Sequence, residues 1–139
     1  MDKAIHDDNK DWFLVTLNNI VNNNSITIGI TLFSHGFIIS GHLAGGKEYF
    51  DATAGEFSAL LNNSGKVENS FIELANRIYD SESDNVKNGP LSTDYIHIKN
   101  AKFFNSSTND VLPNDSVWWR GRISEVSGFS IGVINGDSE

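Results

Sequence analysis

The sequence predicts one α+β domain, in which a bent antiparallel sheet of about five strands packs with an N-terminal helix and an inserted helical pair. Apolar residues recur every three or four positions in three segments, as they do along one face of an amphipathic helix. Elsewhere they alternate with polar residues, which is the pattern of a half-buried strand. The 139 residues, of which 39% are hydrophobic, suffice for one core. We therefore expect a single domain over 1–139, with 1–9 and 135–139 frayed.

The predicted chain order is one helix, two strands, two helices and three strands, or α-β-β-α-α-β-β-β. Asp11 is a suitable N-cap for the first helix. The apolar stripe of that helix is predicted to consist of Phe13, Leu17, Ile20 and Val21, with Leu14 beside them. Segments 25–33 and 37–43 alternate as strands on either side of a short turn, which predicts a hairpin. Short connections of this kind favour a meander of antiparallel strands.

The middle of the chain changes period and predicts the helical pair, at 47–61 and 67–79. Gly45-Gly46 ends the strand pattern before the first of these helices. The two apolar stripes are predicted to consist of Tyr49, Thr53, Phe57, Leu60 and Leu61 in the first helix, and of Phe71, Leu74, Ala75 and Ile78 in the second. The polar segment 80–94 is predicted to be a loop.

Three strands complete the predicted sheet. In segment 95–104, alternation places Ile96 and Ile98 on one face. The other face is predicted to carry Tyr95, His97, Lys99, Ala101 and Phe103. The polar segment 105–116 is predicted to be a long connection. The last two strands, within 117–134, are expected to form a hairpin around a tight turn at Ser127-Gly128.

The charge of the chain is negative and unevenly distributed. The net charge is −8. Residues 1–94 carry 6 basic and 13 acidic side chains (6 − 13 = −7), whereas residues 95–139 carry 4 and 5 (4 − 5 = −1). Such a surface repels phosphate backbones and anionic lipid, so nucleic acid and membranes are poor candidates as partners. The absence of cysteine, of a secretory signal and of a 20-residue apolar run favours a cytoplasmic protein outside the membrane.

Motifs for catalysis, metal binding or cofactor binding are not found in the sequence. The four histidines lack the spacing of a zinc site, and the carboxylates are scattered rather than paired. The glycines at Gly41, Gly45 and Gly46 lack the spacing and the Lys-Ser/Thr ending of a phosphate-binding loop. We therefore predict no catalytic residue, no metal and no cofactor, and expect a protein that is not an enzyme.

The most distinctive stretch is VWWRGRIS, which begins at Val117. Alternation predicts that Val117, Trp119, Gly121 and Ile123 face the core. The opposite face would carry Trp118, Arg120 and Arg122, and Trp and Arg are enriched at binding hot spots. With neighbouring side chains of the third strand, the candidate interaction residues are Trp118, Arg120, Arg122, Lys99, His97 and Tyr95. The alternative is that the chain's own acidic helices cover Trp118 and pair with both arginines.

Three blocks of the sequence resemble the gas vesicle accessory protein GvpU family. These blocks are ITLFSHGFIISGHLAGGKEYFDA at 30–52, YIHIKNAKFF at 95–104 and WWRGRISEVSGFSIG at 118–132. Ser127 stands where an aspartate is common in the family, and both residue types suit a turn. The resemblance implies a non-enzymatic accessory role at gas vesicles, through contacts with the shell or with other gas vesicle proteins. It implies a part in vesicle assembly or clustering, and charge complementarity between the arginines and the acidic helices offers a route to self-association.

Two other classes of protein remain open from the sequence. A helix followed by five strands is also the order of Sm-like and SH3-like barrels, although the inserted helical pair departs from both. An Sm-like oligomeric module would contact nucleic acid or another protein, and salt-sensitive RNA binding would identify it. A small-ligand or enzymatic domain would instead need an enclosed pocket with converging polar groups.

Overall fold

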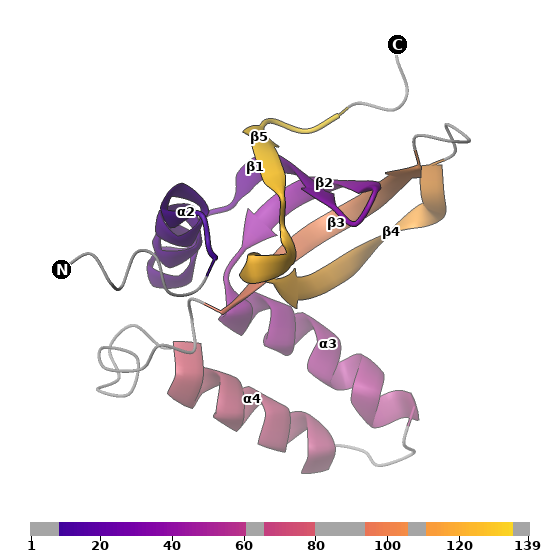
Figure 1. The fold of residues 1–139 in the computed structure, drawn as a ribbon. Helices are drawn as coiled ribbons and strands as arrows, with labels where there is room; N and C mark the ends of the chain where they lie inside the picture. Colours follow the sequence, from indigo (N-terminus) through magenta and orange to yellow (C-terminus); the bar gives the residue numbers. More distant parts are fainter. Residues whose placement is uncertain (1–8, 61–65, 80–93, 106–110, 135–139) are drawn as a thin grey trace, which may run out of the picture.

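The sheet has five strands in the order β4-β3-β2-β1-β5, and neighbouring strands are antiparallel. A computed structural model describes residues 9–60, 66–79, 94–105 and 111–134 (Figure 1). Its elements are α2 (Trp12–Asn23), β1 (Ile28–Ser34), β2 (Phe37–Ala44), α3 (Gly46–Leu60), α4 (Lys66–Tyr79), β3 (Tyr95–Asn105), β4 (Val111–Arg122), a 3-10 turn (Ile123–Glu125) and β5 (Gly128–Ile131). The predicted α+β class and the antiparallel sheet are confirmed.

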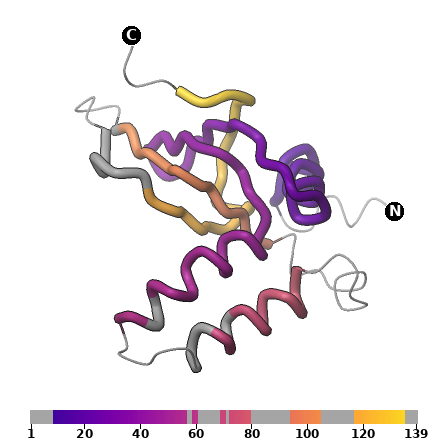
Figure 2. The backbone as a smooth tube through the Cα atoms, turned by 180° about the vertical axis from the view of Figure 1, so that it is seen from behind, coloured from indigo at the N-terminus to yellow at the C-terminus, as the bar shows by residue number. Residues whose placement is uncertain are grey.

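The helices lie in two separate places on the sheet. Helices α3 and α4 run side by side, and α2 lies against a different part of the sheet (Figures 1 and 2). Asp11 caps α2 as predicted, because its carboxylate accepts a hydrogen bond from the backbone N–H of Phe13 at 2.8 Å. Residues 80–93 of the loop predicted at 80–94 lie outside the described residues, as do residues 1–8 and 135–139 of the predicted frayed ends and the side chains of Phe57, Leu61 and Phe71.

The core lies between α2 and one face of the sheet. Its buried members are aliphatic side chains from α2, from β1 to β3 and from the 3-10 turn: Leu14, Val21, Ile30, Leu32, Ile39, Leu43, Ile96, Ile98, Ala101 and Ile123. Trp119 and Phe129 pack against them from β4 and β5. Ile123 and Trp119 thus face the core as the alternation predicts, while Val117 is 39% exposed.

The predicted apolar stripe of α2 is partly wrong. The buried residues of this helix are Leu14, Asn18 and Val21, whereas Phe13 and Ile20 are exposed. The difference arises at Asn18, whose side-chain N–H donates a hydrogen bond to the backbone oxygen of Tyr95 at 3.0 Å. A polar residue thus occupies the centre of the buried face, which a search for apolar residues alone does not find.

The alternation predicted for the side chains of β3 is interrupted in the middle of the strand. Ala101 and Phe103 share the core face with Ile96 and Ile98, contrary to the simple alternation. Strand β3 has one extra residue relative to both neighbours, between Ile98 and Ala101, and Asn100 has a positive φ of 54°. Such a β-bulge shifts the alternation by one residue. Gly41 permits it, because a Cβ at this position would lie 2.7 Å from the backbone oxygen of Lys99.

Strand β4 begins earlier than predicted. Residues 111–116, expected to lie in a polar connection, form the first half of a long strand, and the first two of them pair with the end of β3. The pairing joins Phe103 to Leu112 and Phe104 to Val111. Backbone hydrogen bonds hold an edge strand whatever the polarity of its side chains, so the polar composition of this segment hid the strand.

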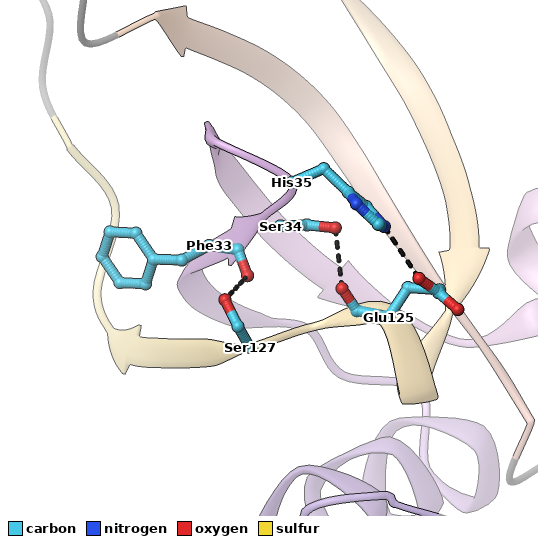
Figure 3. A network of polar contacts seen from close by, with 5 residues as sticks. All are labelled: Phe33, Ser34, His35, Glu125 and Ser127. Atoms are coloured by element: carbon cyan, nitrogen blue, oxygen red, sulfur yellow. Dashed lines mark hydrogen bonds and ion pairs between the residues drawn. The ribbon is translucent and has the colours of Figure 1, made fainter.

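The predicted hairpin within 117–134 is also wrong. The chain leaves β4 at Arg122, makes the 3-10 turn, and reaches the far side of the sheet, where β5 pairs with β1. The tip of the β1–β2 hairpin holds this crossing in place (Figure 3). The Ser34 hydroxyl donates to the backbone oxygen of Glu125, and the Ser127 hydroxyl donates to the backbone oxygen of Phe33. These local hydrogen bonds replace the tight turn expected at Ser127-Gly128.

Candidate interaction surface

The structure brings the six predicted interaction residues together on two neighbouring strands. Tyr95 is paired with Arg122 and His97 with Arg120 across β3 and β4. Alternation along β3 places them on the face opposite Ile96 and Ile98, and therefore opposite the core. We call this face the aromatic–basic face, and it consists of Tyr95, His97, Lys99, Trp118, Arg120 and Arg122.

His97 lies at the centre of this face and has no exposed surface. Three rings from the helical pair surround its imidazole, with centroid distances of 4.6 Å to Tyr49, 5.8 Å to Tyr79 and 6.1 Å to Phe50. Burial, assisted by the positive charge of Arg120, lowers the pKa of His97 from 6.5 to about 3. The imidazole is therefore neutral at physiological pH.

The hydrogen bond to His97 also fixes its tautomer. The guanidinium Nε of Arg120 donates to Nε2 of His97 at 3.2 Å. Because Nε2 accepts, the ring proton is on Nδ1. This second nitrogen is buried, and no described residue accepts its proton. The cluster thus holds an uncharged imidazole among aromatic rings, an arrangement for packing rather than for proton transfer.

Arg120 connects the strands to the helical pair. Its guanidinium carbon lies 4.1 Å from the ring centroid of Tyr95 and 5.6 Å from that of Phe50, within the range of cation–π contacts. Burial raises the pKa of the Tyr79 hydroxyl above its usual 10.0. A hydrogen bond between Arg120 and this hydroxyl has a smaller, opposite effect. In the described part of the chain, Arg120 thus meets rings and His97, and not the acidic side chains that the alternative supposed.

Two further contacts attach the beginning of α3 to the same face. The Lys99 ammonium lies 2.6 Å from a carboxylate oxygen of Glu48. The Trp118 indole meets the ring of Tyr49 edge-on, with centroids 5.4 Å apart. The alternative therefore holds in part, since α3 contacts Trp118 and supplies an acidic partner, but to a lysine. Much of the aromatic–basic face is the docking site of the chain's own helical pair.

Arg120 and Arg122 nevertheless remain exposed along β4, which is an edge of the sheet. A hydrogen bond with the Tyr95 hydroxyl raises the pKa of the Arg122 guanidinium, and the nearby Glu125 and Asp94 act in the same direction. The groups that act on Arg122 are Tyr95, Glu125 and Asp94, and none of these described residues belongs to α3. Arg122 is therefore the residue of the aromatic–basic face that is most available to a partner, and such a contact stays a prediction.

The sequence did not single out the residues that cover this face. Tyr49, Phe50 and Tyr79 were expected on apolar stripes or at a helix end, not as the partners of a buried histidine. The tyrosine at the end of α4 packs on the first residue of α3, where a Cβ on Gly46 would lie 2.4 Å from its ring atoms. The second glycine of Gly45-Gly46 was thus a signal for close helix packing, in addition to its role as a strand terminator.

Within the part of the chain that the structure describes, no three histidine or carboxylate side chains are grouped closely enough to hold a metal ion. The described helices include none with the length and apolar character needed to cross a membrane.

Comparison with known proteins gives one match. The family model described as "Gas vesicle protein GvpU-like" matches residues 11–134, which span every described helix and strand. No curated protein and no solved structure matches the chain. The likeness to Sm-like and SH3-like barrels therefore stays a prediction based on element order. Because the family model covers most of the chain, the protein belongs to the GvpU-like family of gas vesicle proteins.

Proposed function

We propose that this protein is a non-enzymatic accessory protein that acts in gas vesicle assembly or clustering through protein–protein contacts and self-association. The observation that carries the proposal is the family match over residues 11–134. The protein would lie in the cytoplasm on the vesicles, in contact with the shell or with other gas vesicle proteins. The neutral, ring-packed state of His97 supports a structural role for this buried histidine.

A nucleic-acid-binding role of Sm-like type is less well supported. Three lysines of the described chain form ion pairs with carboxylates: Lys10 with Asp94, Lys47 with Asp51, and Lys99 with Glu48. Each paired lysine is less available to a phosphate group. Together with a net charge of −8, this leaves little positive surface for a nucleic-acid backbone.

The first test is co-flotation of the purified protein with isolated gas vesicles, at low and at physiological salt. We expect the protein to float with the vesicles and the association to weaken with salt, because Arg120 and Arg122 are exposed cations of the aromatic–basic face and Arg122 is the more available of the two. The Arg122→Glu variant should lose most of the association. Lys47→Glu is the matched control, since it makes the same change of charge at another exposed position.

The same samples test clustering. Light scattering or microscopy of vesicles mixed with the protein should show larger clusters than vesicles alone. Absence of co-flotation at both salt concentrations would remove direct contact with the shell. Absence of both co-flotation and clustering, in a sample that also contains the other gas vesicle proteins, would remove the proposed function.

A further inference from the structure

The two edges of the sheet differ in how well they are protected from another strand. Edge strands usually carry charge, proline or bulges, which prevent pairing with a second chain. The β4 edge has such protection in its sequence, with Pro113, Asp115, Arg120 and Arg122. The β5 edge, Gly128–Ile131, contains neither a charge nor a proline. Among the described elements, no strand pairs with the outer side of β5.

The hydrogen-bonding groups of β5 point alternately toward β1 and away from it. The backbone N–H of Gly132 donates to the backbone oxygen of Gly29 at 2.8 Å, which identifies these two residues as a hydrogen-bonded pair. In an antiparallel ladder such pairs alternate, so Ser130 also faces its partner Thr31 on β1. The backbone groups of Phe129 and Ile131 therefore point outward, toward the open edge.

Four apolar side chains, three of them exposed and one half-buried, lie beside this edge. We call them the β5 apolar cluster: Trp12, Phe13, Phe129 and Ile131. The Phe13 ring lies 5.5 Å from that of Phe129 and 5.7 Å from that of Trp12. Trp12 is 68% exposed, Ile131 59% and Phe13 44%. Phe129 packs against the core, and Ile131, two residues further, lies on the same face of the strand.

We infer that the β5 edge and the β5 apolar cluster form the site at which two copies of this chain associate. An antiparallel pairing of β5 with β5 around a two-fold axis at Ser130 places Phe129 opposite Ile131 of the other copy. These are the two residues with outward backbone groups, so each such pair exchanges two hydrogen bonds. The same arrangement places Phe129 beside Ile131 of the other copy on one face. The strand is therefore complementary to itself.

A second copy suits this edge because of charge. The chain carries −8, so most of its surface repels another copy, whereas the four residues of β5 are uncharged. The edge is short, and two pairs of hydrogen bonds are a weak interface by themselves. Burial of Trp12, Phe13 and Ile131 must add to it. We therefore expect a concentration-dependent dimer that joins two five-stranded sheets. This inference rests on the self-association in the proposed function and names its site.

A single cysteine tests the register directly, because the natural chain has none. The two-fold axis makes Ser130 its own partner in a non-hydrogen-bonded pair, where Cα atoms are about 4.5 Å apart and a disulfide can form. We expect Ser130→Cys to form a disulfide-linked dimer rapidly under mild oxidation. The matched control is Leu60→Cys, at a residue of α3 that is 80% exposed. It should remain monomeric under the same conditions.

Sedimentation over a range of concentrations gives the second measurement. We expect the dissociation constant of the dimer to rise about tenfold or more in Ile131→Lys, because a charge then lies against the apolar side chains of the other copy. Leu60→Lys makes the same change of charge on the helical pair and should leave the dimer unchanged. Both positions are exposed, so neither variant should prevent folding.

The possible outcomes separate this inference from the proposed function. If the wild-type protein associates but Ser130→Cys links no faster than Leu60→Cys, self-association stands and the β5 site is wrong. If the wild-type protein is monomeric at every concentration, the self-association in the proposed function and the β5 site are both wrong. If it is monomeric alone but binds vesicles in a way that Ile131→Lys abolishes, the edge binds another protein, and the assignment to a second copy is overturned.

Discussion

Beneath α2 the sheet presents aliphatic side chains such as Ile30 and Ile98, whereas beneath the start of α3 it presents His97, Lys99 and Arg120. The first face is held by burial of apolar area, which has no direction. The second is held by ring contacts, an ion pair and a hydrogen bond, each of which needs a particular geometry. One sheet thus attaches its two helical units by different physical means.

The two kinds of attachment predict different stabilities for the two helical units. An aliphatic interface with Leu14 fully buried should form and unfold together with the sheet. Among the described residues, the contacts between the aromatic–basic face and the helical pair lie at one end of that pair, at Glu48, Tyr49 and Phe50 of α3 and Tyr79 of α4. We therefore expect the helical pair to be the less stable unit, and the one that conditions such as pH and salt can loosen.

The largest expected effect comes from breaking the aliphatic face. Leu14→Ala removes a side chain with no exposed surface from the centre of the core. We expect the free energy of unfolding to fall by about 2–5 kcal/mol, the usual cost of such a cavity. Urea unfolding followed by tryptophan fluorescence measures this change. Amide exchange should show that β2 and α2 are destabilised together.

The matched control for this change is Leu60→Ala. It is the same substitution at a residue of α3 that is 80% exposed. We expect a change within about 0.5 kcal/mol, as for surface substitutions in general. An equal loss of stability in the two variants would mean that α2 does not cover the main core, and the contrast between the two faces would then fail.

The second effect uses pH to weaken the aromatic–basic face through His97. The pKa of His97 is lowered to about 3, below its unfolded value of 6.5. The unfolded chain thus takes up a proton between these values that the folded chain does not. The stability from neutral His97 is complete above pH 6.5 and is lost as the pH falls toward 3. We expect a loss of about 2 kcal/mol between pH 7 and pH 5.

Two variants make the pH measurement specific to this histidine. His97→Phe keeps an aromatic ring in the cluster but cannot titrate, so its free energy of unfolding should depend less on pH than that of the wild type. Tyr49→Phe keeps both His97 and the ring beside it, so it should retain the wild-type dependence. Equal pH dependence in the wild type and in His97→Phe would show that the histidine is not the group responsible.

Much of this fold was predictable because its helices and strands follow local rules. The α+β class, the cap at Asp11 and the first hairpin all depend on residues close together in the sequence. The exceptions depend on distant partners. The bulge at Asn100 is accommodated by Gly41 on the neighbouring strand, and β5 joins β1 almost a hundred residues away. Periodicity predicts that a strand forms, but not which strand it pairs with.

The candidate surface was predictable to a similar degree. Alternation correctly placed His97 on one face of its strand and Arg120 on one face of the next, and the structure makes them neighbours. It did not predict that α3 would cover them, because Tyr49 and Phe50 have the same period whether they face the sheet or solvent. A buried histidine also has no separate signature in one sequence. Only its three-dimensional neighbours distinguish it from an exposed one.

The smallest effect compares ion pairs on and off the aromatic–basic face. Lys99 and Glu48 join the sheet to α3 at 2.6 Å, whereas Lys47 and Asp51 lie one turn apart on α3 at 3.5 Å. Double-mutant cycles with Lys→Met, Glu→Gln and Asp→Asn should give a coupling of about 0.2–1 kcal/mol for the first pair and at most about 0.5 kcal/mol for the second. Both couplings should decrease with salt. Removal of the Lys99–Glu48 pair should speed amide exchange throughout α3, because this pair joins the helix to the sheet. Removal of the Lys47–Asp51 pair, which lies within α3, should not. Equal effects on exchange would mean that the ring contacts position α3 without this ion pair.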